Sequence, residues 1–131
     1  MFVCQRPASG GTFPSKADKL FYKYLSRYGF EDAHITDLVK CSDKAGKLDS
    51  ATVRNCLPIL VEEIGLLKPD LIVAVGKDTE KEIEKQVKPR LDPGVQVEEI
   101  YHYSYVSRYG REKKLRKQMR RIAKLAGVRT R

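Results

Sequence analysis

The segment over residues 100–110, IYHYSYVSRYG, concentrates side chains that could do chemistry. It holds His102, one of the chain's two histidines, with Ser104 two residues later, and four of the seven tyrosines. A neutral imidazole can donate a hydrogen bond to a developing oxyanion without carrying a full charge. A serine hydroxyl can bond a phosphate oxygen. The alternative for a lone histidine is an ordinary polar residue at the end of a strand.

Positive charge follows this segment closely. The chain has a net charge of +9, and residues 107–131 hold eleven Lys or Arg residues against one acidic residue, Glu112. Residues 1–106 are therefore close to neutral. Such a block indicates a polyanionic partner, and nucleic acid fits best. A solvated helix face tuned for solubility is the alternative.

Length and composition are typical of one soluble globular domain. The chain has 131 residues, of which 41% are hydrophobic and 33% charged, which is ordinary for such a domain. It has no apolar run of about 18 residues, so no membrane span is expected. The N-terminal MFVCQRPASG lacks the layout of a signal peptide, which favours a cytoplasmic protein. Three scattered cysteines and two histidines predict neither a disulfide framework nor a zinc site.

Hydrophobic periodicity predicts strands that alternate with helices. Strands are expected at 2–6, 33–39, 70–76 and 95–103, where apolar or alternating runs occur. Helices are expected at 15–28, 53–67, 79–87 and 108–126, where apolar residues recur every three or four positions. Capping is predicted from Ser15 and Asp18 for the first helix, and from Thr79 and Glu82 for the third. The whole of residues 1–126 is expected to form one domain, with 127–131 as a frayed basic tail.

This alternation predicts an α/β fold, a three-layer α/β/α sandwich around a four-stranded parallel sheet. Ligands of such sheets bind at the carboxyl ends of the strands. Four strand exits would line that edge, and they read QRPAS, DLVKC, GKDT and HYSYVSR.

Four segments, taken in order, resemble the uracil-DNA glycosylase superfamily, most of all its iron–sulfur (family 4-like) branch. They are VCQRPAS, FPSKADKLFYKYLSRYGFEDAHITDLVKC, CLPILVEEIGLLKPDLIVAVG and HYSYVSR, the last at the place of the family's His-Pro-Ser motif. The resemblance covers nearly the whole chain and implies the sheet order 2-1-3-4. It also implies a monomeric DNA-binding protein of base-excision repair, which flips a deaminated base, uracil or a related one, for hydrolysis of its N-glycosidic bond.

The resemblance implies roles for four residues in a base pocket. His102 would donate to the leaving base, and Gln5 would orient a water. Phe13 would stack on the flipped base, although it fits a core position equally well. Asp37 stands where the family has Asn. Because an ionised carboxylate only accepts hydrogen bonds, Asp37 suits a base that offers amino or ring N–H groups better than it suits uracil. An Asp bonded to neighbouring backbone is the alternative.

Backbone contacts to DNA are implied for Arg6, Ser104, Ser107, Arg108 and Arg111. Tyr105 is a candidate wedge, whereas Tyr101 fits the core equally well, and Tyr103 replaces the family's proline. The family has a Glu, Asp or Asn at one of the two positions that Gln5 and Arg6 occupy here, and neither Gln5 nor Arg6 can neutralise a sugar cation. The sequence therefore leaves open whether the chain is an active hydrolase or a non-catalytic nucleic-acid-binding relative. A third alternative, a small nucleotide-binding domain, rests on VGKDT, which lacks a glycine-rich phosphate loop.

The cysteines match the iron–sulfur branch only in part. Cys41 and Cys56 correspond to two of the four cluster ligands, as remnants of a possible cluster site, and the N-terminal CxxC pair has no counterpart in this chain. Since a four-iron cluster needs four thiolates, no intact cluster and no other cofactor is expected. Cys4 on the first strand is expected in the core.

Overall fold

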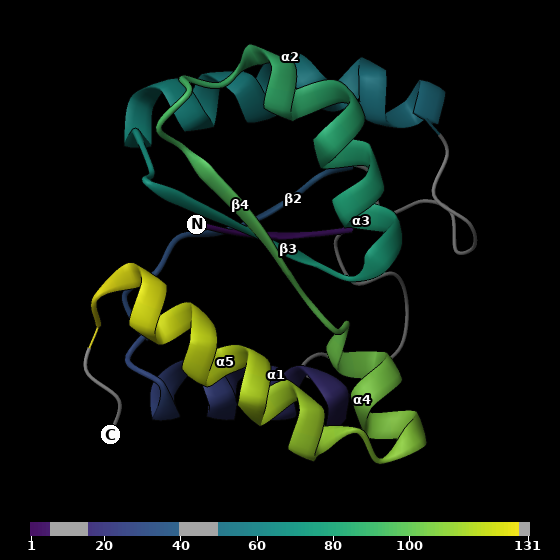
Figure 1. Cartoon of the computed structure of the whole chain (residues 1–131). Helices are drawn as coiled ribbons and strands as arrows, with labels where there is room; N and C mark the ends of the chain where they lie inside the picture. Colours follow the sequence, from purple (N-terminus) through teal and green to yellow (C-terminus); the bar gives the residue numbers. More distant parts are fainter. Residues whose placement is uncertain (6–15, 40–49, 129–131) are drawn as a thin grey trace.

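The computed structural model describes residues 1–5, 16–39 and 50–128. Three layers are visible in Figure 1, with the sheet in the middle, α2 and α3 on one face, and α1, α4 and α5 on the other. The strands are parallel and in the order β2-β1-β3-β4. The predicted three-layer sandwich and its strand order are confirmed.

The four strands place all their carboxyl ends at one edge of the sheet. They are β1 (Phe2–Cys4), β2 (Ile35–Asp37), β3 (Leu71–Val75) and β4 (Gln96–Ile100). Phe2 of β1 lies opposite Ile35 of β2 and Val73 of β3, and Val75 of β3 lies opposite Ile100 of β4. The loops and turns that follow the strands therefore share one edge.

Helices cover both faces of the sheet. They are α1 (Lys16–Arg27), α2 (Ser50–Leu67), α3 (Lys77–Glu82), α4 (Tyr103–Tyr109) and α5 (Glu112–Ala126), with a π-helical turn η1 (Ile83–Val87) and a 3₁₀ turn η2 (Lys88–Arg90) after α3. No helix in the described ranges is both long and apolar enough to cross a membrane.

The alternating strand positions divide the core into two clusters. Phe2 and Val73 pack with the apolar faces of α1 and α5, whereas Val3 and Ile72 pack with α2. Both faces of β3 are buried, which explains the continuous apolar run that predicted a central strand. The second histidine, His34, contributes to this scaffold. His34 Nε2 and Thr36 Oγ1 each lie 3.0 Å from the Glu63 carboxylate, which ties β2 to α2.

Two boundary predictions near the end of the chain are wrong. The fourth strand ends at Ile100 rather than 103, and the helix predicted from 108 to 126 begins at Glu112, after a separate helix, α4, at 103–109. His102 starts α4 by capping it, and Gly110 ends α4 in the left-handed conformation, at φ 63°. The predicted helix start at Thr79 is also wrong, because α3 begins at Lys77 and Thr79 is buried within it.

The helix α5 ends at Gly127, which has φ 70°. The Val128 N–H donates to the Ala123 carbonyl (3.1 Å), and the Val128 side chain packs against the α1/α5 core cluster. Residues 129–131 of the predicted tail, like Ser15 of the predicted capping box, lie outside the described residues.

Two glycines are expected to respond oppositely to alanine substitution. Gly76 has φ 101° and ψ 152°, a conformation that is essentially restricted to glycine, so Gly76→Ala should lower the free energy of unfolding by about 1–3 kcal/mol. Gly65 lies in α2 and an added Cβ would meet no atom within 4 Å, so Gly65→Ala should raise that free energy by roughly 0.5–1 kcal/mol. Urea denaturation of both variants checks this, and equal effects would contradict the assigned backbone conformations.

Candidate active site

The exits of β3 and β4 approach each other closely at the shared edge. The Gly76 N–H donates to the Ile100 carbonyl (2.9 Å), which extends the β3–β4 pairing past the end of β3. A Cβ built on Gly76 would lie 3.4 Å from the Cβ of His102 and 3.6 Å from its ring. The chain after β3 therefore passes beside His102, and a glycine permits the positive φ of this turn.

His102 is the N-cap residue of α4. Its Nδ1 accepts a hydrogen bond from the Ser104 backbone N–H at 3.0 Å, and its carbonyl accepts from the Val106 N–H at 3.1 Å. Because Nδ1 accepts, the proton of the neutral ring is on Nε2. Burial lowers the pKa of His102, and the nearby charge of Asp18 opposes this shift. The side chain is therefore a neutral imidazole with an Nε2–H donor at neutral pH.

A stack of aromatic rings holds the His102 imidazole in place. Tyr103 stacks on His102 with ring centroids 4.3 Å apart, and on Phe21 of α1 with centroids 4.7 Å apart. Burial raises the pKa of Tyr103, with smaller contributions from the charges of Cys4 and of Asp18 and Asp37, so its phenol is protonated at neutral pH. Tyr103 thus packs the site against the core.

A hollow of about 340 Å³ opens beside His102. Its walls are formed by Gln5 from the exit of β1 and by residues at the start and outer face of α4. The lining residues are Gln5, His102, Ser104, Tyr105, Arg108 and Tyr109. The structure therefore brings together four of the predicted site residues, Gln5, His102, Ser104 and Arg108. No carboxylate is found among the described residues that line this hollow.

Asp37 lies at the same sheet edge but is not part of that lining. It is paired in register with Cys4, on the sheet face that α1 covers. Burial, with a smaller contribution from Asp37, raises the pKa of Cys4 to about 12. The acid whose charge acts on His102 is instead Asp18 in the first turn of α1. Sequence reasoning assigned Asp18 only to a helix cap, and no local pattern points from α1 to His102.

Other predicted site residues have varied positions. Ser107 lines a separate hollow on the opposite side of α4. Arg111 is exposed between α4 and α5, where its N–H donates to the Val106 carbonyl. The Ser104 N–H donates to His102 Nδ1, and Ser104 also lines the hollow beside His102. Arg6 and Phe13 lie outside the described residues.

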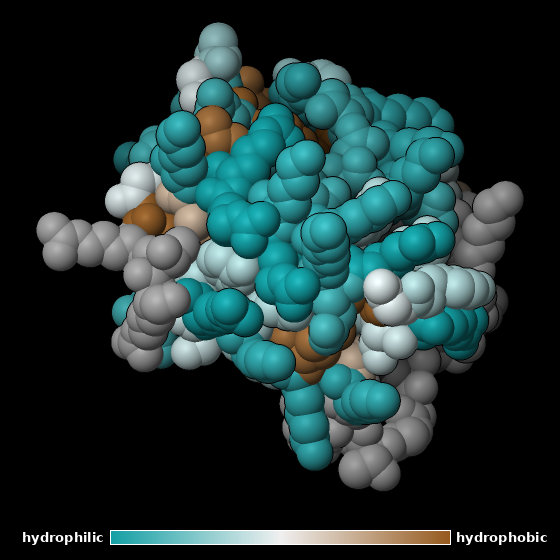
Figure 2. All heavy atoms as spheres, turned by 60° about the horizontal axis from the view of Figure 1, so that its bottom comes forward, coloured by the Kyte–Doolittle hydropathy of each residue, from teal (hydrophilic) through white to brown (hydrophobic). Residues whose placement is uncertain are grey.

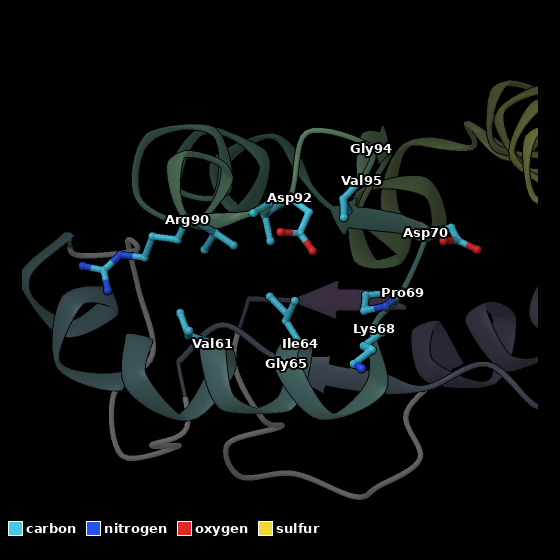
Figure 3. A pocket seen from close by; sticks show the side chains of 12 residues that line it. Val61, Ile64, Gly65, Lys68, Pro69, Asp70, Arg90, Asp92, Gly94 and Val95 are labelled. Carbon is cyan, nitrogen blue, oxygen red and sulfur yellow. The ribbon is translucent and has the colours of Figure 1, made fainter.

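A larger hollow of about 470 Å³ lies at the other edge of the sheet (Figure 3). Val61 and Ile64 of α2 project into it, and Asp92 projects into it from the turn before β4. Asp70 and Val95, which precede β3 and β4, also line it. It contains none of the predicted site residues, and its position at the amino ends of parallel strands is not the usual one for a ligand.

The cysteines do not form a ligand set in the described part of the chain. Cys4 and Cys56 are buried in different core clusters on opposite faces of the sheet, and Cys41 lies outside the described residues. The described ranges contain no group of three or more His, Cys, Asp or Glu side chains placed to hold a metal ion. With three cysteines in all, this chain cannot by itself supply the four thiolates of a four-iron cluster.

Comparison with known proteins finds similarity to uracil-DNA glycosylases. The family model of the uracil DNA glycosylase superfamily matches residues 1–126. A type-4 uracil-DNA glycosylase from Pyrobaculum aerophilum is 38% identical over 71 residues, which are 52% of this chain and 36% of that protein. The match thus spans about a third of the relative's length. Because the family model covers almost all of this sequence, the chain belongs to the uracil-DNA glycosylase superfamily.

Proposed function

We propose that this chain binds DNA and releases a flipped, deaminated base by hydrolysis of its N-glycosidic bond. Family membership supports the glycosylase class, and the name of the Pyrobaculum relative supports uracil or a related base as the substrate. As the bond breaks, negative charge develops on the carbonyl side of the departing base. A fixed donor aimed at that charge stabilises the transition state more than the ground state.

The observation that carries this proposal is the hydrogen bond from the Ser104 N–H to His102 Nδ1. This bond leaves the other ring nitrogen of His102 as the donor, beside a hollow that Gln5 and Arg108 also line. Burial lowers the pKa of His102, so the ring donates as the neutral imidazole. In the proposed reaction His102 donates from Nε2 to the base oxygen, and Gln5 orients the attacking water.

The remaining lining residues suit a nucleotide that has left the duplex. Tyr105 and Tyr109 are 42% and 57% exposed, with ring centroids 5.1 Å apart, and offer surfaces for stacking or for wedging between bases. Arg108 adds a positive charge that fits a backbone phosphate. The pocket is therefore proposed to bind the flipped nucleotide, and α4 the adjoining backbone.

A second candidate function is that of a non-catalytic nucleic-acid-binding relative. The observation that favours it is the composition of the hollow, where Gln5 and Arg108 but no carboxylate occur among the described lining residues. An amide can orient water but cannot neutralise a sugar cation. The two functions differ in one measurement, because only the glycosylase leaves alkali-labile abasic sites in DNA.

Substitution of His102 should separate its catalytic role from its structural one. Asparagine is a good N-cap residue, so His102→Asn should keep α4 capped while it removes the imidazole donor. Base release should then fall by about 10²–10⁴-fold, with little change in the melting temperature. His102→Ala should lose both the donor and the cap, which costs about 0.5–2 kcal/mol of stability.

The measurement uses labelled duplexes that contain uracil, hypoxanthine, xanthine or a mismatched cytosine, followed by alkaline cleavage. Strand breaks from the wild type that disappear in His102→Asn support the glycosylase. A wild type that binds all four duplexes and breaks none would support the non-catalytic relative.

Asp37→Asn tests the proposed base-reading role of Asp37. An amide both donates and accepts, whereas the ionised carboxylate only accepts. The substitution should shift the relative rate of base release toward uracil and away from bases that offer N–H donors. The ratio of cleavage rates on the four duplexes provides the measurement. An unchanged ratio would remove Asp37 from the base pocket.

Tyr103→Leu tests whether the aromatic stack keeps His102 neutral. Removal of the ring should let water reach the imidazole, so the pKa of His102 should rise toward its ordinary value. The proposed donor is the neutral imidazole. The rate of base release by the wild type should therefore fall only when the pH drops through the lowered pKa of His102. In Tyr103→Leu the same fall should occur at a higher pH. Heteronuclear NMR of the imidazole nitrogens follows both the tautomer and the titration.

Tyr22→Leu is the matched control, because Tyr22 is exposed and contacts Phe21 without stacking on His102. Its rate profile should coincide with that of the wild type. Identical profiles for Tyr103→Leu and the wild type would contradict the role given to the stack.

A further inference from the structure

One helical layer carries all of the chain's excess positive charge. Together α1 and α5 contain eleven Lys and Arg residues and two acidic residues, Asp18 and Glu112. Their excess of nine equals the net charge of +9 of the whole chain. Both helices lie on the same face of the sheet, and Figure 2, in which this side comes forward, shows a broadly hydrophilic surface.

The charges follow the solvent-facing side of each helix in rows. On α1 the row lies opposite the buried Phe21, Tyr24 and Leu25, and on α5 it lies opposite the buried Leu115, Met119 and Ile122. The rows consist of Lys16, Lys19, Lys23 and Arg27 on α1, and of Lys113, Lys117, Arg120 and Lys124 on α5, all exposed; α5 also exposes Lys114 and Arg121, and Arg121 pairs with Glu98. Each row extends for about 16 Å, at about 1.5 Å per residue, which is the axial length of about five DNA base pairs.

A groove of about 360 Å³ runs along the α1 row, beside α4 and the start of α5. We call it the α1–α4 groove. Lys16, Lys19 and Lys23 form one wall, and Leu20 and Val106 supply apolar surface. Ser107, Gly110 and Glu112 complete the lining. The groove thus has several cations along one side and a single carboxylate, that of Glu112, at one end.

We propose that the α1–α4 groove and the basic rows of α1 and α5 form a second nucleic-acid surface, which binds the phosphodiester backbone without reading bases. Positive charges spaced along two rows match the phosphates of a nucleic acid, and neutralisation of each phosphate releases counterions. An anionic membrane is a poorer match. A helix that lies in a membrane interface needs a continuous exposed apolar face. In these two fully described helices the exposed large hydrophobic residues are Tyr22 and Leu125, which do not form such a face.

The position of α4 connects this surface to the hollow beside His102. Tyr105 and Arg108 face that hollow, while Val106 and Ser107 line the groove on the opposite side of the same helix. A strand whose nucleotide occupies the hollow can therefore continue around α4 into the groove. The inference extends the proposed function but does not require base release, since it concerns DNA of any sequence.

The test measures binding to a 20-base-pair duplex without any altered base, by fluorescence anisotropy over a range of salt concentrations. The variant removes four exposed charges from both rows, with the changes Lys19→Gln, Lys23→Gln, Lys117→Gln and Arg120→Gln. A matched control removes four exposed charges elsewhere on the molecule, with the changes Arg54→Gln, Lys81→Gln, Lys85→Gln and Arg90→Gln.

The row variant should bind the duplex at least about tenfold more weakly than the control variant. The slope of the logarithm of the binding constant against the logarithm of the salt concentration should decrease in magnitude by about 0.9 for each phosphate that the row variant no longer neutralises. Glu112→Gln, which removes the carboxylate from the groove, should bind more tightly than the wild type. Equal affinities and slopes for the row variant and the control would overturn the proposal.

Two further points distinguish a failure of this proposal from a failure of the proposed glycosylase activity, and DNA binding from lipid binding. Binding to the undamaged duplex is measured without any base release, so a protein that fails to release bases still tests the groove. Vesicles that contain phosphatidylglycerol serve as the lipid probe. If the row variant loses affinity for these vesicles but keeps its affinity for DNA, the surface binds lipid and the proposal is wrong.

Discussion

The hydrogen bond from the Ser104 N–H to His102 Nδ1 is the interaction on which the carboxyl edge of the sheet depends. It satisfies a backbone donor at the start of α4, where a helix has no carbonyl partner of its own. The same bond determines which nitrogen of the imidazole carries the proton. A single contact therefore caps α4 and selects the tautomer of a side chain that lines the hollow.

The alternation of strands and helices could be predicted because burial imposes it on the sequence. The β3 run LIVAV is apolar throughout, since both faces of this strand are covered, and α5 repeats apolar residues at Leu115, Met119 and Ile122. The helix α4 could not be predicted in the same way. Residues 103–106 are rich in aromatic and β-branched types that favour strands, and the histidine cap overrides that propensity.

The site could be predicted only to the level of the sheet edge. Parallel strands place their exits together, and Gln5 and His102 do share a hollow. Which side of the edge a residue occupies depends on the register of its strand. Asp37 is paired with Cys4 and so lies on the face that α1 covers. Neither this register nor the influence of Asp18 on His102 leaves a signal in the local sequence.

The distribution of charge follows from the layered architecture. A helix that covers one face of a sheet buries one side and leaves the other in water, so the outer sides of α1 and α5 can be basic at little cost to the core. The layer of α2 and α3 is different, because Glu63 and Glu82 form hydrogen bonds with Thr36 and Ser50 and so join neighbouring elements. Carboxylates of the α2 and α3 layer thus join neighbouring elements, while α1 and α5 carry the excess of cations.

The strand order also bears on self-association. Among the described strands, the order β2-β1-β3-β4 places β2 and β4 at the two edges of the sheet, and an edge strand can recruit the same strand from another copy. β2 is only three residues long, and β4 carries the adjacent Glu98 and Glu99. Burial and the nearby Glu80 already raise the pKa of Glu99. If the β4 strand of a second copy paired with this edge, its glutamates would lie close to Glu99 and would be partly removed from water. The glutamates thereby protect the longer open side of the sheet against edge-to-edge aggregation.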